Sequence, residues 1–195
     1  KIIVLDDSRG CPYRCAFCMH PIESGGKLRT ASAELLVNRM EAMRESHGIT
    51  AFRFAGSSTP GELMAKVAEL IVQRGLQVRY TCFGHFRSAR PDHFELMARS
   101  GLHAIFYGIE SGCQEVLDKA VGKKLDLQTV RDTIRAAQQA GVFVVASMIV
   151  PLPFDTEETM AESLEFLKQV RPDSVPVQFP GVIPPTPWGQ NPEAY

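Results

Sequence analysis

The residues with the clearest chemical meaning are three cysteines near the start of the chain, Cys11, Cys15 and Cys18, spaced as CxxxCxxC. Thiolates gathered this closely bind zinc or iron–sulfur clusters. The chain has five cysteines, an odd number, and these three are too close in sequence to form a disulfide framework. We therefore expect metal ligation in a reducing compartment. A zinc ion or a four-iron cluster takes four ligands, and the motif supplies three thiolates. The fourth ligand therefore comes from elsewhere in the chain, or one iron has no protein ligand.

A structural zinc site is the alternative interpretation of the same residues, with His20 as a candidate fourth ligand. Structural zinc sites usually pair two knuckles of this kind, and the sequence has no second one. An iron–sulfur cluster is the favoured interpretation, and a non-catalytic zinc-binding module is the alternative. We expect Cys82 to lie inside a strand and Cys113 at the start of a helix, both as structural residues.

Composition restricts the class of protein. The chain has 195 residues, 45% of them hydrophobic, and a formal net charge of -1. These values predict one globular domain, and the interspersed charges give no indication of a nucleic-acid partner. No apolar run reaches the ~20 residues that cross a bilayer, and the first residues lack the charged-then-apolar pattern of a secretory signal, so we expect a cytoplasmic protein without a membrane partner. Because the chain begins at Lys1 and runs straight into a strand, we expect a piece of a longer protein.

Strand and helix patterns alternate along the whole chain. Short apolar runs predict strands at residues 2–5, 51–55, 78–82, 102–109, 142–150 and 174–179. Helical spacing predicts helices within residues 32–48, 63–75, 91–101, 126–141 and 155–172. Each of Gly48, Gly75, Gly101 and Gly141 ends a helix directly before an apolar strand start.

Repeated βα units favour parallel strands with right-handed crossovers. The predicted fold class is α/β, a partial (βα)6 barrel of the TIM type, and a doubly wound sheet is the alternative. In either fold the ligand site lies at the C-terminal ends of the strands, which is where the cysteine loop falls. We assign residues 1–179 to this core. The proline-rich residues 180–195 are predicted to form an extended segment leading to a missing C-terminal part.

The cysteine motif also carries a family resemblance. Cys11, Cys15 and Cys18, with Phe17 directly before the third cysteine, resemble the cluster-binding motif of radical S-adenosylmethionine enzymes. The resemblance spans the chain and implies a [4Fe–4S] cluster whose open iron binds S-adenosylmethionine. One electron, from a donor such as flavodoxin or ferredoxin, would then cleave the cofactor to a 5′-deoxyadenosyl radical that attacks a small-molecule or peptide substrate.

Weaker matches imply further cofactor contacts. Gly56 and Ser57 follow the second strand, where family members bind the methionyl amino group, although the usual Gly-Gly-Glu is not present. Glu110 and Ser111 resemble the Gly-x-Glu-Ser-Gly segment that faces the ribose or methionyl end of the cofactor. A plain turn at Gly56–Ser58 remains open, as does a role for Glu110 in neutralising a buried basic residue.

Two apolar residues complete the implied cofactor set. The backbone at Ile149 would lie against the adenine, although Phe154 and Asp155 stand where the family has Gly-Glu. Phe17 would contact the cofactor or simply belong to the core.

The segment from Arg9 to Cys18, which holds the cysteine motif, is most similar to those members of the family that carry a cobalamin-binding domain upstream of the barrel. The resemblance thus implies the catalytic core of an enzyme for cobalamin-dependent methylation, with cobalamin bound through a missing N-terminal domain, or a methylthiotransferase. No histidine spacing suggests a metal pair, and no residue is singled out as a catalytic acid or base.

Overall fold

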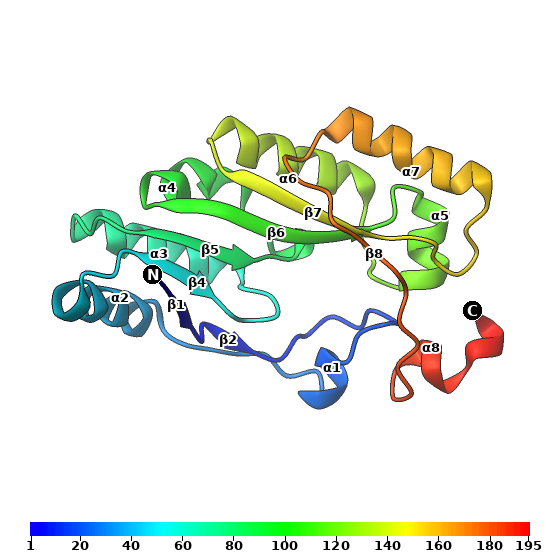
Figure 1. The fold of residues 1–195 in the computed structure, drawn as a ribbon, viewed down its shortest axis with the longest axis horizontal. Coiled ribbons are helices and arrows are strands. Elements are labelled where there is room, and N and C mark those ends of the chain that lie inside the picture. The colour runs from blue at the N-terminus through cyan, green and yellow to red at the C-terminus, as the bar shows by residue number, and fades with distance from the viewer.

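The computed structural model describes all residues from Lys1 to Tyr195 (Figure 1). Its centre is a parallel six-stranded sheet in the order β1-β4-β5-β6-β7-β8. The strands are β1 (Ile2–Leu5), β4 (Ala51–Phe54), β5 (Arg79–Phe83), β6 (Leu102–Glu110), β7 (Phe143–Ile149) and β8 (Val177–Gln178). The strand order follows the chain without a reversal. A doubly wound sheet requires such a reversal, so that alternative is wrong and the partial-barrel prediction is confirmed.

Helices connect successive strands, and a small antiparallel pair lies beside the first. The main connecting helices are α2 (Ala33–His47), α3 (Gly61–Gln73), α4 (Phe94–Arg99), α6 (Leu127–Gln139) and α7 (Glu157–Val170). The shorter elements are β2 (Ser8–Arg9), β3 (Arg29–Thr30), α1 (His20–Glu23), α5 (Gln114–Val116), a π-helical turn (Leu117–Val121) and α8 (Pro187–Gln190). Single 3-10 turns lie at Phe86–Ser88, Pro91–His93 and Pro192–Ala194.

Local sequence explains where the helices start and stop. The Ser32 hydroxyl accepts a hydrogen bond from the Leu35 amide at the start of α2, and Gly48 ends that helix with a φ of 64°. Asp126 caps α6 as predicted. At α7 the cap is Thr156, in a reciprocal pair with Thr159, because the helix begins one residue later than the predicted Asp155 start.

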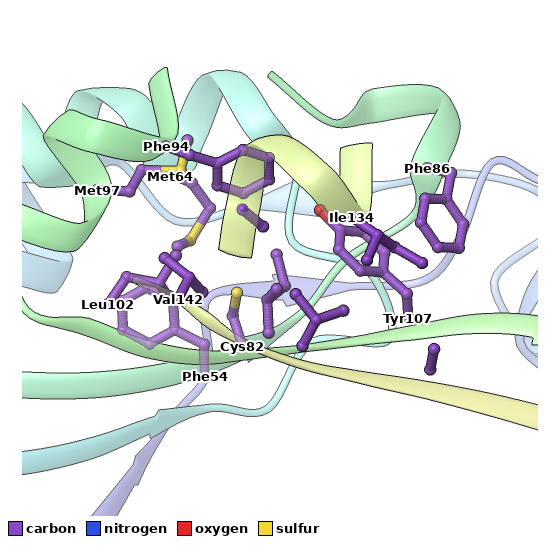
Figure 2. Packing of buried hydrophobic residues seen from close by; sticks show 14 of the residues in the cluster. Phe54, Met64, Cys82, Phe86, Phe94, Met97, Leu102, Tyr107, Ile134 and Val142 are labelled. Atoms are coloured by element: carbon purple, nitrogen blue, oxygen red, sulfur yellow. The ribbon is translucent and has the colours of Figure 1, made fainter. Parts of the chain in front are cut away.

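The strands alternate between two environments. Tyr80 and Cys82 on β5 are almost fully buried in the hydrophobic core, where Figure 2 shows Cys82 among Phe54, Met64 and Leu102. Phe83, one residue further along, instead lines a cavity on the opposite face of the sheet. This period-two alternation separates a helix-covered core from an inner face that is free to hold ligands.

The C-terminal segment differs from the extended conformation predicted for residues 180–195. Thr186 caps α8, and Pro187 occupies the first helical position, where its missing N–H costs no hydrogen bond. Trp188 is 2% exposed, and its indole Nε1 donates a hydrogen bond to the Ala120 carbonyl at 2.8 Å. The segment therefore folds back onto the barrel. None of the helices has the length and apolar character needed to cross a membrane.

Candidate functional site

A cavity of about 380 Å³ lies at the C-terminal ends of the strands. Its wall includes all three cysteines of the CxxxCxxC loop together with Glu110 and Lys123. Parallel α/β folds bind their ligands at this end of the sheet. The predicted position of the cysteine loop is therefore confirmed in the structure.

The three thiols fit a cluster better than a single ion. All three cysteines are free, yet no group of three His, Cys, Asp or Glu side chains gathers closely enough to hold one metal ion. Ligands of one zinc must all lie within about 2.3 Å of a common point, whereas cluster ligands are distributed over different irons. Three thiols on one loop at the wall of one cavity are a donor set that suits the second arrangement.

Burial governs the protonation of these thiols. It raises the pKa of Cys15 to about 11, and it also raises the pKa of Cys11 and Cys18 above the ordinary value. The positive charge of Lys123 opposes this rise at all three residues. Lys123 therefore favours the thiolate form that metal binding requires.

Several elements hold the cysteine loop in place. The Ala16 amide donates a hydrogen bond to the Val121 carbonyl at 2.8 Å, which ties the loop to the π-helical turn. Trp188 of α8 packs against Phe17, with ring centroids 5.5 Å apart. Gly10 enters the loop with a φ of 84°, and a Cβ there would lie only 2.1 Å from the Lys27 carbonyl oxygen. The loop thus has a defined shape before any ligand is considered.

Asp7 joins two loops near the cavity through hydrogen bonds, a role that the sequence did not predict. The residue is fully buried and accepts hydrogen bonds from the Gly56 amide at 2.6 Å, the Thr59 hydroxyl at 2.7 Å and the Ser8 hydroxyl at 3.0 Å. These bonds join the loop after β1 to the loop after β4. A Cβ on Gly56 would lie 1.9 Å from the Ser8 oxygen, so this glycine is required for close packing.

Glu110 and Lys123 form a buried ion pair at the cavity, with Nζ and Oε1 2.9 Å apart. Both side chains are less than a tenth exposed, and Lys123 also donates to the Gly108 carbonyl oxygen. The open alternative, that Glu110 neutralises a buried basic residue, is confirmed. Its cofactor contact stays a prediction, and the sequence analysis missed Lys123.

The remaining predicted cofactor residues divide into two groups. Phe17 and Ser57 line the cavity with the cysteines. Ser111 and Ile149 do not: the Ser111 hydroxyl lies 3.1 Å from that of Ser163, and Ile149 is buried in the core. Gly56 is likewise turned toward Asp7 and not toward the cavity. The structure brings the first group together with the thiols, whereas the second group makes its contacts away from the cavity, with Ser163, with the core and with Asp7.

An aromatic contact links the cysteine loop to the loop after β5. The rings of Tyr13 and His85 stack with centroids 3.5 Å apart and an interplanar angle of 15°. Arg87 lies over the same tyrosine ring at 5.3 Å. No sequence pattern relates residues so far apart, so only the folded chain shows this contact.

The fold and this cavity define a class of protein. The model of the radical SAM superfamily matches residues 6–167, and the chain belongs to this superfamily of enzymes. The cofactors of the family are a [4Fe–4S] cluster and S-adenosylmethionine.

Similar curated proteins include several that transfer one-carbon groups. The chain is 26% identical to an uncharacterized methyltransferase of Pyrococcus horikoshii, covering 91% of this chain and 40% of that protein. It is 28% identical to hopanoid C-2 methylase of Rhodopseudomonas palustris, covering 92% of this chain and 36% of the enzyme. It is also 28% identical to a putative methylthiotransferase of Methanocaldococcus jannaschii, covering 94% of this chain and 43% of that protein. The chain therefore spans well under half the length of these relatives.

Solved structures share the fold. The methyltransferase TsrM of Kitasatospora setae, solved with cobalamin and a [4Fe–4S] cluster, superposes with a TM-score of 0.86 at 16% identity, covering 96% of this chain and 38% of TsrM. The cobalamin-dependent enzyme OxsB gives a TM-score of 0.73 at 18% identity, covering 98% of this chain and 29% of OxsB. Both confirm the partial barrel.

Proposed function

We propose that this chain is the catalytic core of an enzyme that binds a [4Fe–4S] cluster through Cys11, Cys15 and Cys18 and cleaves S-adenosylmethionine reductively. The observation that carries the proposal is the placement of three free thiols around one cavity at the C-terminal ends of the strands. When bound, the cluster supplies the electron that yields methionine and a 5′-deoxyadenosyl radical.

The chain's own residues prepare the cavity for this chemistry. The charge of Lys123 opposes the rise that burial causes in the pKa of the three thiols, and Lys123 is itself paired with Glu110. Phe17 and Ser57 contribute to the wall that faces the cofactor. The Asp7 carboxylate fixes the loop that carries Ser57, so the wall is preorganised.

We further propose that the radical serves cobalamin-dependent methylation, with cobalamin bound by a part of the full protein outside this chain. The methyltransferases among the relatives and the two cobalamin-dependent structural neighbours support this assignment. The substrate would be a small molecule or a peptide, and a protein such as flavodoxin or ferredoxin would donate the electron. Methylthio transfer is the second candidate, because one relative at 28% identity is a putative methylthiotransferase.

Cluster assembly tests the first part of the proposal. Anaerobic reconstitution with iron and sulfide should give about four irons and four sulfides per chain in the wild type. Cys11→Ala, Cys15→Ala and Cys18→Ala should each lose most of this content, whereas Cys113→Ala, outside the cavity, should retain it. One tightly bound zinc per chain without iron–sulfur absorption would instead support the zinc module.

Cofactor content of the full-length protein separates the two transfer reactions. If the protein is produced with cobalamin in the medium, methylation predicts about one cobalamin retained per chain. Methylthio transfer predicts a second iron–sulfur cluster and no cobalamin.

A further inference from the structure

A second cavity, of about 250 Å³, also borders the cysteine loop. Its wall comes from this loop, from the segment of α1 and from Pro187 of α8, and no strand of the sheet contributes to it. Figure 1 shows α1 and α8 together below the sheet, on the side away from α6 and α7. Arg14, Ile22 and Pro187 in this wall are exposed, so the cavity is open to solvent. We call it the outer groove.

Two of the three motif cysteines belong to both cavities. Cys15 and Cys18 line the reaction cavity and also the outer groove, and both are partly exposed. Cys11 is buried and lines the reaction cavity but not the groove. From outside the molecule, Cys15 and Cys18 are therefore the thiols that a partner in the groove approaches.

The reaction cavity is a poor route for an electron during turnover. In the proposed function S-adenosylmethionine and the substrate occupy its volume of about 380 Å³. A protein at its mouth would have to act through both ligands. The outer groove reaches two of the same thiols with neither ligand in between.

The charges around the outer groove are mostly positive. Arg14 lines it, and Lys27 directly follows its pair of glycines. Lys124 lies in the turn of Gly122, where a Cβ would stand 3.9 Å from the Arg14 carbonyl oxygen. The acid beside them is Glu23 on α1. All four charged residues are exposed and none forms an ion pair within the protein, so three cations against one anion favour an acidic partner.

The groove also offers apolar contact. Ile22 is 42% exposed at its wall, next to Pro21. Gly25 and Gly26 have open space where side chains would stand, so a partner can approach the backbone closely there. Exposed apolar groups bordered by charges are typical of protein-binding surfaces.

We propose that the outer groove is the docking surface for the electron donor, a one-electron carrier protein with an acidic face. This inference rests on the proposed function and locates the partner of that site. In each transfer the carrier loses one electron and the cluster held by the three cysteines gains it, and no covalent bond changes. Arg14 and Lys27 would orient the carrier, and Ile22 would pack against it.

Binding of a carrier tests this surface without turnover. Oxidised flavodoxin is the first probe and oxidised [2Fe–2S] ferredoxin the second, each titrated calorimetrically into the reconstituted protein at low salt. Arg14→Glu should raise the Kd roughly 3- to 30-fold, because it removes one attraction and adds one repulsion. Ile22→Ala should raise it roughly 2- to 5-fold. Arg135→Glu is the matched control: it changes the net charge equally, lies on α6 outside the groove and should shift the Kd less than about twofold.

The source of the electron separates docking from chemistry. With reduced flavodoxin below its Kd, Arg14→Glu should form 5′-deoxyadenosine more slowly by the same factor as its rise in Kd. With dithionite, a small reductant that needs no docking surface, the variant should match the wild type. Lys27→Glu lies outside the cysteine loop and decides the matter where Arg14→Glu holds less iron.

Three results would overturn the inference: no binding of either carrier to the wild type, equal changes in Kd for Arg14→Glu and Arg135→Glu, or an equal loss of rate with flavodoxin and with dithionite in a variant that keeps its iron. A wild type that forms no product with dithionite fails the proposed function instead. The binding data then still decide whether the groove is a docking surface.

Discussion

Two opposite charges face the cavity from positions where water scarcely reaches them. The carboxylate of Glu110 and the ammonium of Lys123 are each less than a tenth exposed and lie 2.9 Å apart. Burying a charged pair costs free energy of folding. Removing one partner costs more, because the other charge then stays buried without compensation. A pair retained at this position therefore points to a role for Lys123 beside the thiols.

Replacing Lys123 tests the energetics of this pair. We expect Lys123→Met to lower the free energy of unfolding by roughly 3–5 kcal/mol, measured by urea denaturation. Lys119→Met is the matched control, since Lys119 pairs with Glu115 at the exposed surface and should cost less than about 1 kcal/mol. Adding Glu110→Gln to Lys123→Met should recover part of the loss. Equal effects of the two lysine substitutions would contradict this account of the pair.

His85 predicts a pH dependence of stability. Burial, together with the positive charges of Lys123 and Arg87, lowers the pKa of His85 from 6.5 to about 3, so between these values the unfolded chain binds more protons than the folded one. Stability should therefore fall as the pH is lowered through this window, by up to about 1.4 kcal/mol per pH unit. His85→Phe removes this contribution. From pH 7 to 5 the wild type should lose roughly 2 kcal/mol more than the variant, and parallel losses would exclude a depressed pKa.

At the scale of elements, the cysteine loop is held by segments distant in sequence. The π-helical turn receives the Ala16 amide, and α8 places Trp188 against Phe17. Because Trp188 is the only tryptophan of the chain, its fluorescence reports directly on this contact.

Removing the Trp188 ring should loosen the cysteine loop. Trp188→Ala should cost roughly 3–5 kcal/mol in the free energy of unfolding and lower the iron retained after reconstitution. Phe179→Ala is the control, because Phe179 is 86% exposed and its removal should change stability by less than about 0.5 kcal/mol. In the wild type, cluster assembly should quench the tryptophan fluorescence. Full iron retention in Trp188→Ala would show that α8 does not support the loop.

The contact between the loop after β1 and the loop after β4 depends on Gly56. In Gly56→Ala the added Cβ meets the Ser8 hydroxyl and the Asp7 carboxylate, and we expect a loss of roughly 1–3 kcal/mol by chemical denaturation. Gly181→Ala adds its methyl group in open space and should change stability by less than about 0.5 kcal/mol. Similar stability for both variants would indicate that the loops are not locked through Asp7.

At the scale of the whole molecule, local patterns were sufficient to predict the barrel. The four junction glycines have positive φ angles, and the predicted strands appear in sequential order. The short helix at Pro187–Gln190 was missed because prolines at helix starts resemble prolines of extended segments.

The site was only partly predictable from the sequence. The spacing of three cysteines is enough to indicate a metal-binding motif from the sequence, and the structure places all three at one cavity. Asp7, His85 and Lys123 are single residues without a spacing pattern, and their roles arise from contacts between distant loops. The side chain of Ile149 lies in the core, and the predicted contact of its backbone with the adenine stays a prediction.

The central claim is that this cavity cleaves S-adenosylmethionine by one-electron reduction. The most direct measurement is the formation of 5′-deoxyadenosine, followed by chromatography, after the reconstituted protein is reduced with dithionite in the presence of the cofactor. We predict product from the wild type and Cys113→Ala, and none from Cys18→Ala. A wild-type protein that holds a complete cluster and still forms no 5′-deoxyadenosine would contradict the account.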